Sequence, residues 1–196
     1  MNRLAKQAIR RTLPTPLFYI LYRRAARRLG DASCARHELF RQLIDESTGL
    51  SCLQIGVRDA KLAPHWVSVD LYDESDLIDF HCDIHDLQFA DESYDVVVCN
   101  AVLEHVETPE RAISELGRVL RPGGRIWVEV PFNQPYHAAP SDFWRVSPSG
   151  LRIWMRDFEE TAVGFFTIYG CPIDTGVFYF GRKPKRSARG DSTLRR

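Results

Sequence analysis

The segment SYDVVVCNAVLEHVETPERAISELGRVLRPGGRIWVEVP, residues 93–131, decides the fold. Residues 94–100 are a β-rich run that stays apolar until its end, which is typical of a strand buried on both faces. Thr108 and Pro109 then predict a helix start, with a hydroxyl at the N-cap and a proline at the first helical position. A Pro-Gly-Gly turn at 122–124 ends that helix before the next strand. The segment therefore predicts one strand–helix–strand crossover of a parallel sheet.

Apolar periodicity predicts the remaining elements around this crossover. The helix carries an apolar face at helical spacing, made by Ala112, Ile113, Leu116, Val119 and Leu120. Further helices are expected at residues 34–48 and 147–155, and strands at 51–57, 66–72, 80–84, 94–100, 125–130, 163–169 and 177–181. The connections that follow the first two strands are short, so they are expected to be loops or single turns rather than full crossover helices.

The sequence of the crossover resembles that of the class I S-adenosylmethionine (SAM)-dependent methyltransferases, especially the bacterial type 11 group. Members of that group have a strand that ends in a small or polar residue, then LEHV, then a helix that ends in LRPGG. The resemblance covers about residues 34–182. It implies a Rossmann-like α/β fold with a mostly parallel seven-stranded sheet, whose last strand runs antiparallel, and here with trimmed crossover helices. It also implies an enzyme that uses SAM as its cofactor.

Three predicted strands end in residues suited to a nucleotide-like ligand, which in open parallel sheets binds beyond the carboxyl ends of the strands. Gly56 ends the first strand in LQIGVRD, where a residue without Cβ lets the backbone approach a ligand. Asp70 ends the second in VSVDLY, where a carboxylate can accept both ribose hydroxyls. By resemblance, Asp83 in CDIHDLQF accepts from the adenine amino group beside Ile84, and Asn100 lies at the methionyl end of the cofactor.

The first loop departs from the family pattern, which is usually GxGxG. Here it reads GVRDA over residues 56–60, with one glycine of the three. Arg58 and Asp59 place bulk and charge where the backbone normally lies close to the cofactor. Alternatives therefore remain open: Gly56 can be a simple turn, Asp70 a solvated carboxylate, and Asp83 part of a local polar network with nearby histidines.

The stretch PFNQPYHAAPSDFWRVSPSGLRIWM, residues 131–155, is a loop up to Pro140 and ends in a capped helix. A loop after the carboxyl end of a strand is where an acceptor pocket is expected. The stretch resembles a segment of bacterial methyltransferases, many of which lie in pathways for surface polysaccharides. The expected substrate-binding residues of this loop are Tyr136, Asp142, Trp144 and Arg145. Aromatic rings can hold a sugar face, and the arginine can hold a phosphate or carboxylate. Arg145 can instead form a salt bridge with Asp142.

An oxygen acceptor must lose a proton before or during methyl transfer. His137 is the first candidate base because it stands in the acceptor loop, and histidine titrates near neutrality. His105 in LEHV is the second candidate. Either histidine can instead brace the loop. No metal ligand set is predicted, because the His81–Asp86 cluster has no second group of ligands at recognisable spacing.

Charge is distributed unevenly along the 196 residues, whose formal net charge is zero. Residues 1–36 hold nine Lys or Arg against one acid, and residues 182–196 hold seven against one. We expect three parts: a basic helical extension at 1–33, a methyltransferase-like domain at 34–182 and a basic disordered tail at 183–196. Residues 1–30 suit either peripheral contact with an anionic membrane or a helix packed on the domain with its arginines in solvent. The acidic body makes nucleic acid an unfavourable partner.

The five cysteines show no CxxC pairing, which suits free thiols in a cytoplasmic protein. The chain lacks GxGxxG and GxxxxGK[ST], so a dehydrogenase or a P-loop enzyme is disfavoured. The leading hypothesis is a SAM-dependent methyltransferase that acts on an oxygen of a small or glycan-linked acceptor. The alternative is a methyltransferase-like domain without catalysis that serves as a binding or scaffolding module.

Overall fold

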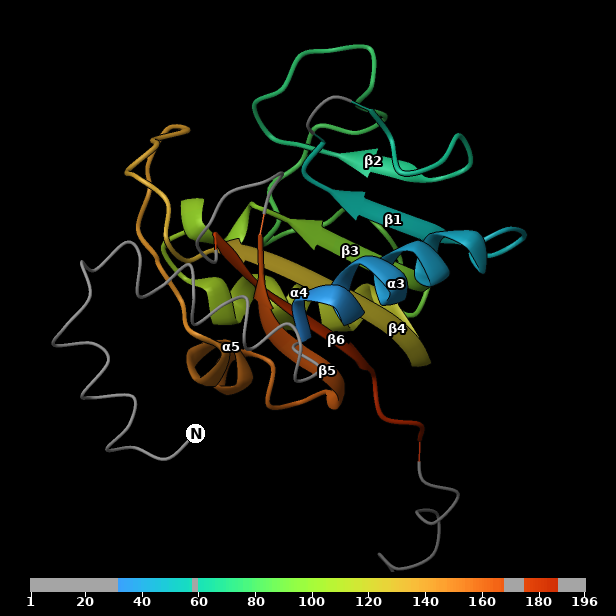
Figure 1. Cartoon of the computed structure of the whole chain (residues 1–196). Helices are drawn as coiled ribbons and strands as arrows, with labels where there is room; N and C mark the ends of the chain where they lie inside the picture. Colours follow the sequence, from blue (N-terminus) through green and yellow to red (C-terminus); the bar gives the residue numbers. More distant parts are fainter. Residues whose placement is uncertain (1–31, 58–59, 168–174, 187–196) are drawn as a thin grey trace, which may run out of the picture.

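The computed structural model describes residues 32–57, 60–167 and 175–186 (Figure 1). The expected basic extension and most of the expected tail lie outside these ranges, as do Arg58 and Asp59. Contact of residues 1–30 with a membrane therefore stays a prediction. Among the described residues, no helix has both the length and the apolar character needed to cross a bilayer.

The core of the protein is one mixed sheet with the strand order β2-β1-β3-β4-β6-β5. The strands are β1 (Cys52–Ile55), β2 (Val67–Val69), β3 (Tyr94–Asn100), β4 (Leu120–Pro131), β5 (Glu159–Phe166) and β6 (Gly176–Arg182). The pairs β1–β2, β1–β3 and β3–β4 are parallel, and β6 is antiparallel to both β4 and β5. The expectation that the last strand runs antiparallel is thus confirmed.

Strand β3 is buried on both faces, as its apolar run predicts. Residues Val96 to Cys99 have no exposed surface. Val97 pairs with Leu53 of β1 on one side and with Ile126 of β4 on the other. The carboxyl ends of β1, β2 and β3 therefore lie at the same edge of the sheet.

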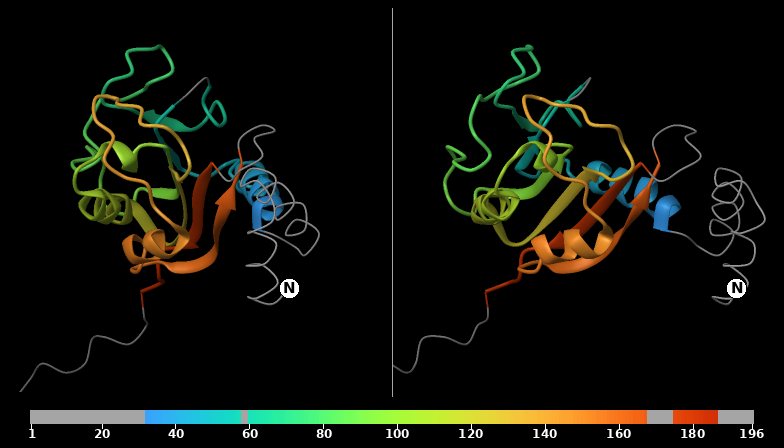
Figure 2. Two further views of the ribbon diagram at one scale, coloured as in Figure 1. Left: turned by 60° about the vertical axis from the view of Figure 1, so that its left-hand side comes forward. Right: turned by 90° about the vertical axis from the view of Figure 1, so that its left-hand side faces the viewer.

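Helices cover both faces of the sheet (Figure 2). They are α3 (Ala32–Asp45), α4 (Pro109–Val119) and α5 (Pro148–Trp154), with a 3-10 turn η1 (Leu103–His105) after β3. The apolar face of α4 is buried with Leu151 of α5 against one side of the sheet. Leu43 of α3 packs with Trp66 and Trp127 on the other side. The predicted helix at 34–48 is thus found about two residues earlier than expected, which is an ordinary boundary error.

The described residues form six strands, whereas seven were expected. The strand predicted at residues 80–84 is reduced to a single bridge between Phe80 and Val69. Alternation is present, since Cys82 and Ile84 are buried while His81 and Asp83 are exposed. The chain nevertheless turns at once, with Asp86 N donating to Asp83 O, so the ladder has no length in which to continue.

Two local details of the crossover also differ from expectation. The helix begins at Pro109 as predicted, but the hydroxyl of Thr108 makes no cap bond and lies 3.1 Å from His85 Nε2 instead. After Val119 no separate turn intervenes: β4 starts directly at Leu120 and includes the Pro-Gly-Gly sequence, where Gly123 has φ +79°. Glycine tolerates this left-handed conformation, so the Pro-Gly-Gly sequence can be part of the strand.

The first two connections are trimmed, as expected. Within residues 52–57 and 60–100 there is no helix. Side chains hold these loops in its place. The Gln54 amide donates to Gly56 O at 3.1 Å and its carbonyl accepts from Leu62 N at 2.9 Å. The carboxylate of Asp79 accepts from both the backbone N and the hydroxyl of Ser68, so the connection after β2 folds back along its own strand.

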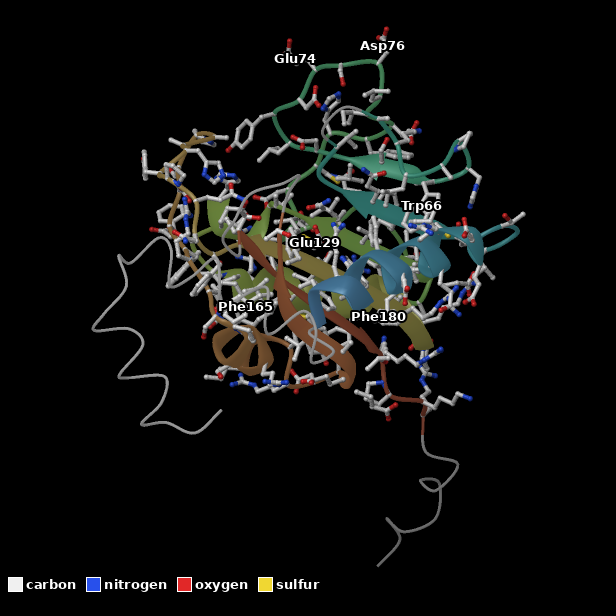
Figure 3. The ribbon with its side chains drawn as sticks, viewed as in Figure 1. Trp66, Glu74, Asp76, Glu129, Phe165 and Phe180 are labelled. Atoms are coloured by element: carbon white, nitrogen blue, oxygen red, sulfur yellow. The ribbon has the colours of Figure 1, made fainter. Side chains whose placement is uncertain are left out.

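Helix α3 is fixed to the sheet through a buried ion pair. Glu129 on β4 is 3% exposed, and its Oε1 accepts from Arg36 Nε at 2.8 Å and from Trp127 Nε1 at 2.9 Å (Figure 3). The guanidinium also lies 4.8 Å from the centre of the Phe166 ring. A buried carboxylate depends strongly on its cation, because removal of one partner leaves an uncompensated charge.

We predict that Arg36→Met lowers the free energy of unfolding by about 3–5 kcal/mol, because methionine keeps apolar contact but leaves Glu129 uncompensated. Urea unfolding followed by fluorescence measures the effect. The double variant Arg36→Met/Glu129→Gln should recover much of the loss. Arg41→Met, an exposed position on the same helix, is the control. An equal small effect of both single variants would contradict this role of the ion pair.

Candidate functional site

A cavity of about 660 Å³ opens at the carboxyl ends of β1, β2 and β3. Its size lies in the range typical of sites for small organic ligands. Seven residues predicted from the sequence line it: Gly56, Asp70, Asp83, Ile84, Asn100, His105 and His137. The structure thus brings the expected cofactor residues and both candidate bases to one place.

Gly56 closes the inner wall of the cavity at the end of β1. Its φ is +78°, and its N donates to Val69 O of β2 at 3.0 Å. A Cβ at this position would lie 2.5 Å from Val102 Cγ2 and 2.8 Å from Asn100 O. Only glycine fits here, because both the backbone conformation and the close approach of β3 exclude a side chain.

Asp70 stands directly after β2 and organises the loop that follows. Its Oδ1 accepts from the backbone N of Tyr72 at 2.9 Å and of Asp73 at 3.0 Å. Such a turn fixes the carboxylate in place. Among the described residues no hydrogen bond reaches Oδ2 of Asp70, so this oxygen remains available to a ligand in the cavity.

Asp83 belongs to a local polar network with a nearby histidine, which is one of the two alternatives that its sequence context allows. Its Oδ1 accepts from His85 N at 2.8 Å and lies 2.7 Å from His85 Nδ1. The hydrogen bond from the backbone N–H of His85, followed by the contact with its ring, holds the pKa of Asp83 below its usual value. The far nitrogen of His85 contacts Thr108 at the start of α4. Asp83 is half exposed and still lines the cavity, so the network positions it there.

Three hydrogen bonds fasten the acceptor loop, residues 132–147, to the segment that follows β3. Phe143 N donates to Glu104 O at 2.7 Å, and Trp144 Nε1 donates to Val106 O at 2.8 Å. His105 Nδ1 lies 2.6 Å from Ser141 O. In Figure 2 the loop, drawn in orange, accordingly passes beside the green turn η1.

Arg145 fixes the loop from within. Its Nη1 and Nη2 each donate to a different oxygen of Asp142 at 2.6 Å, and Nη2 also donates to Pro135 O at 2.8 Å. The Asp142 carboxylate, 1% exposed, accepts from His137 N as well. The hydrogen bonds from Arg145, with a smaller contribution from the backbone N–H of His137, hold the pKa of Asp142 far below its usual value. Asp142 in turn raises the pKa of Arg145. The local salt bridge considered for this pair is therefore present.

The four predicted substrate-binding residues are not part of the cavity wall. Asp142 and Arg145 are engaged with each other, and Trp144 packs edge-on against Trp154 of α5. Tyr136 is 74% exposed at the outer side of the loop. Phe143 of the same loop does line the cavity.

Glu104 is the residue of the site that sequence reasoning missed. It is fully buried in η1, and its Oε1 lies 3.7 Å from His105 Nε2 and 3.8 Å from His137 Nε2. The two imidazole rings are perpendicular, with centroids 5.2 Å apart. The only sequence signal was its place inside LEHV, because an acidic residue in a short turn normally faces solvent.

Comparison with known proteins fits this geometry. Residues 38–128 match a family described as a methyltransferase domain. The chain is 40% identical over 74 residues to the thiol S-methyltransferase TMT1B of Homo sapiens, which is 38% of this chain and 26% of that protein. It is 46% identical over 61 residues to the demethylmenaquinone methyltransferase of Clavibacter sepedonicus, 31% of this chain and 24% of that protein. The chain thus spans about a quarter of these curated relatives.

The fold is shared with solved methyltransferases. A SAM-dependent methyltransferase of Thermotoga maritima superposes with a TM-score of 0.55 and 20% identity, over 68% of this chain and 82% of that one. The domain match supports an enzyme and implies SAM as its cofactor. The cavity fits such a group, because it is large enough and because Gly56, Asp70, Asp83 and Asn100 line it.

We predict that Gly56→Ala destabilises the protein by about 2–5 kcal/mol and abolishes SAM binding, because it combines a strained φ with a clash against β3. Gly49→Ala is the matched control, since Gly49 has φ +80° but nothing within 4 Å of a Cβ. Urea unfolding and calorimetric titration with SAM measure the two effects. Equal behaviour of the two variants would show that the close approach at Gly56 is unimportant.

Proposed function

We propose that this protein catalyses SAM-dependent methyl transfer to an oxygen atom of a small or glycan-linked acceptor. The observation that carries the proposal is the convergence on one cavity of Gly56, Asp70 and Asn100, from the ends of β1, β2 and β3, and of Asp83, from the connection between β2 and β3. Their order along the chain matches the order expected for a nucleoside followed by its methionyl end. The shared cavity wall makes a single bound molecule the simplest occupant.

Each of these residues has a distinct task in the proposal. Asp70 accepts hydrogen bonds from the ribose hydroxyls, since its Oδ1 is already positioned by two backbone N–H groups. Asp83, held by His85, faces the adenine amino group. Gly56 forms part of the inner wall without a side chain. When bound, SAM supplies an activated methyl group on a sulfonium. The protein then needs to align the acceptor and exclude water.

On the acceptor side, His137 is the proposed base. Its Nε2 lies in the cavity wall region 3.8 Å from the buried Glu104 carboxylate, which would stabilise the imidazolium formed when His137 takes the acceptor proton. The Asp142–Arg145 pair holds the loop that carries His137. His105, braced by Ser141 O, is the second candidate.

A glycan-linked acceptor is supported by the exposed aromatic rings of the acceptor loop. Tyr136, Phe143 and Trp144 are all exposed, and aromatic faces suit the apolar face of a sugar ring. The relatives act on other acceptors by name, a thiol and a demethylmenaquinone, so a thiol or a phenol-like hydroxyl belongs in the same assay panel.

We predict that Asp70→Asn weakens SAM binding about 10- to 100-fold, because one charge-assisted acceptor of a ribose hydroxyl is lost. Asparagine can still accept the backbone N–H groups of the turn, so the loop should keep its shape. Asp76→Asn is the control, since Asp76 lies at the outer tip of the same loop (Figure 3). Calorimetric titration measures both. Unchanged affinity in Asp70→Asn would remove Asp70 from the cofactor site.

We predict that His137→Ala lowers turnover by about 100-fold or more while SAM affinity changes little, because a general base contributes at least that factor. Turnover is measured with the best acceptor from a panel of sugars, phenols and thiols. His81→Ala, an exposed histidine outside the cavity wall, should behave like the unmodified protein. Full activity in His137→Ala would exclude it from the reaction.

A further inference from the structure

We infer that Glu104, His105 and His137 form a binding site for one zinc ion at the acceptor end of the cavity. The carboxylate and the two imidazoles come from η1 and from the acceptor loop. Their ligand atoms all lie within 4.8 Å of one another. A His₂Glu set with an open position is one of the ligand sets that catalytic zinc uses.

The distances suit a shared ion better than a hydrogen-bonded cluster. The two separations of 3.7 and 3.8 Å between Glu104 Oε1 and the histidine Nε2 atoms are too long for hydrogen bonds. Two ligands of one zinc ion, each about 2.1 Å from it, can be at most about 4.2 Å apart. Both separations fall inside that limit, so one ion can bridge Glu104 and either histidine. The ligand nitrogens of His105 and His137, which lie within 4.8 Å of each other, must approach to within the same limit for one ion to bind both.

The second shell has the arrangement that metal-binding histidines require. His105 Nδ1 lies 2.6 Å from Ser141 O, and a carbonyl can only accept, so Nδ1 carries the proton and Nε2 presents its lone pair. His137 Nδ1 lies 3.1 Å from Pro135 O and 3.5 Å from Asp142 Oδ2, two acceptors that favour the same tautomer. Arg145 Nη2, at 3.2 Å, is a competing donor there, but it already donates to Pro135 O and Asp142.

The local charge also favours a cation. The Glu104 and Asp142 side chains are each 1% exposed. The guanidinium of Arg145 binds Asp142, and it also interacts electrostatically with Glu104. Arg145 faces both buried carboxylates, and a divalent ion held by the imidazoles of His105 and His137 would add positive charge beside Glu104.

The exposed position of His137, whose side chain is 41% exposed, leaves a face of the ion open to the cavity. An acceptor hydroxyl or thiol can take that open position, and the ion lowers the pKa of a bound O–H or S–H so that its proton passes to solvent water. The imidazoles then act as ligands and the ion replaces His137 as the agent of deprotonation. This acceptor role rests on the proposed methyl transfer, whereas zinc binding does not.

The test uses the full chain, freed of metal with a chelator and dialysed. Titration with zinc by calorimetry should give one site per chain, and titration with cobalt should give visible absorption bands of nitrogen and oxygen ligation without strong thiolate charge transfer. Glu104→Gln and His137→Ala should each weaken zinc binding about 100-fold or more, since even outer-shell changes cost about 10- to 100-fold. His81→Ala should bind zinc as the unmodified protein does.

Circular dichroism and SAM titration of each variant check that it is folded. Because Glu104→Gln keeps the shape of the side chain, a folded Glu104→Gln with unchanged zinc affinity overturns the inference, as does a chain that binds no zinc. Loss of zinc binding in folded Glu104→Gln and His137→Ala supports it. If the chain binds SAM but not zinc, the inference fails while the proposed function stands. If it binds zinc but not SAM, the proposed function fails while the metal site stands.

Discussion

The burial of β3 on both faces is the constraint on which the remaining structure depends. Val96 to Cys99 have no contact with solvent, so this strand must have a neighbour on each side and a helical layer above and below. The pairing of Val97 with Leu53 and Ile126 then fixes where β1 and β4 end. The cavity exists because these ends coincide, and Gly56 is the point where β1 comes too close to β3 for any side chain.

The second organising feature is the acceptor loop, which is held without regular structure. It is joined to the turn after β3 by hydrogen bonds to Glu104, His105 and Val106. The Arg145–Asp142 fork stiffens it from inside. Residues far apart in the sequence, such as His105 and His137, thereby come to face a common point. The chemistry of the site depends on this attachment as much as on the sheet.

The sequence allowed the crossover to be predicted, because it leaves a local pattern of burial and turn chemistry. The antiparallel last strand was predicted from the family resemblance, since no local pattern records the direction in which a strand pairs. The sequence did not allow the outcome at residues 80–84 to be predicted, because burial alternates there as in a strand but the next turn leaves no room for pairing. The prediction that the Thr108 hydroxyl caps the helix was wrong, because this hydroxyl contacts His85 of a loop that is distant in the sequence. Glu104 was missed because its burial is created by a loop some forty positions later, and no local pattern records such a contact.

The order of the sheet has a further consequence for the behaviour of the whole molecule. In the part of the chain that the structure describes, one border strand, β2, is only three residues long, and the other, β5, starts with the exposed acids Glu159 and Glu160. Short or charged rims are poor templates for a strand from another chain. The long apolar strands β3 and β4 are shielded behind these rims, so the native protein should resist fibrillar self-association even at high concentration.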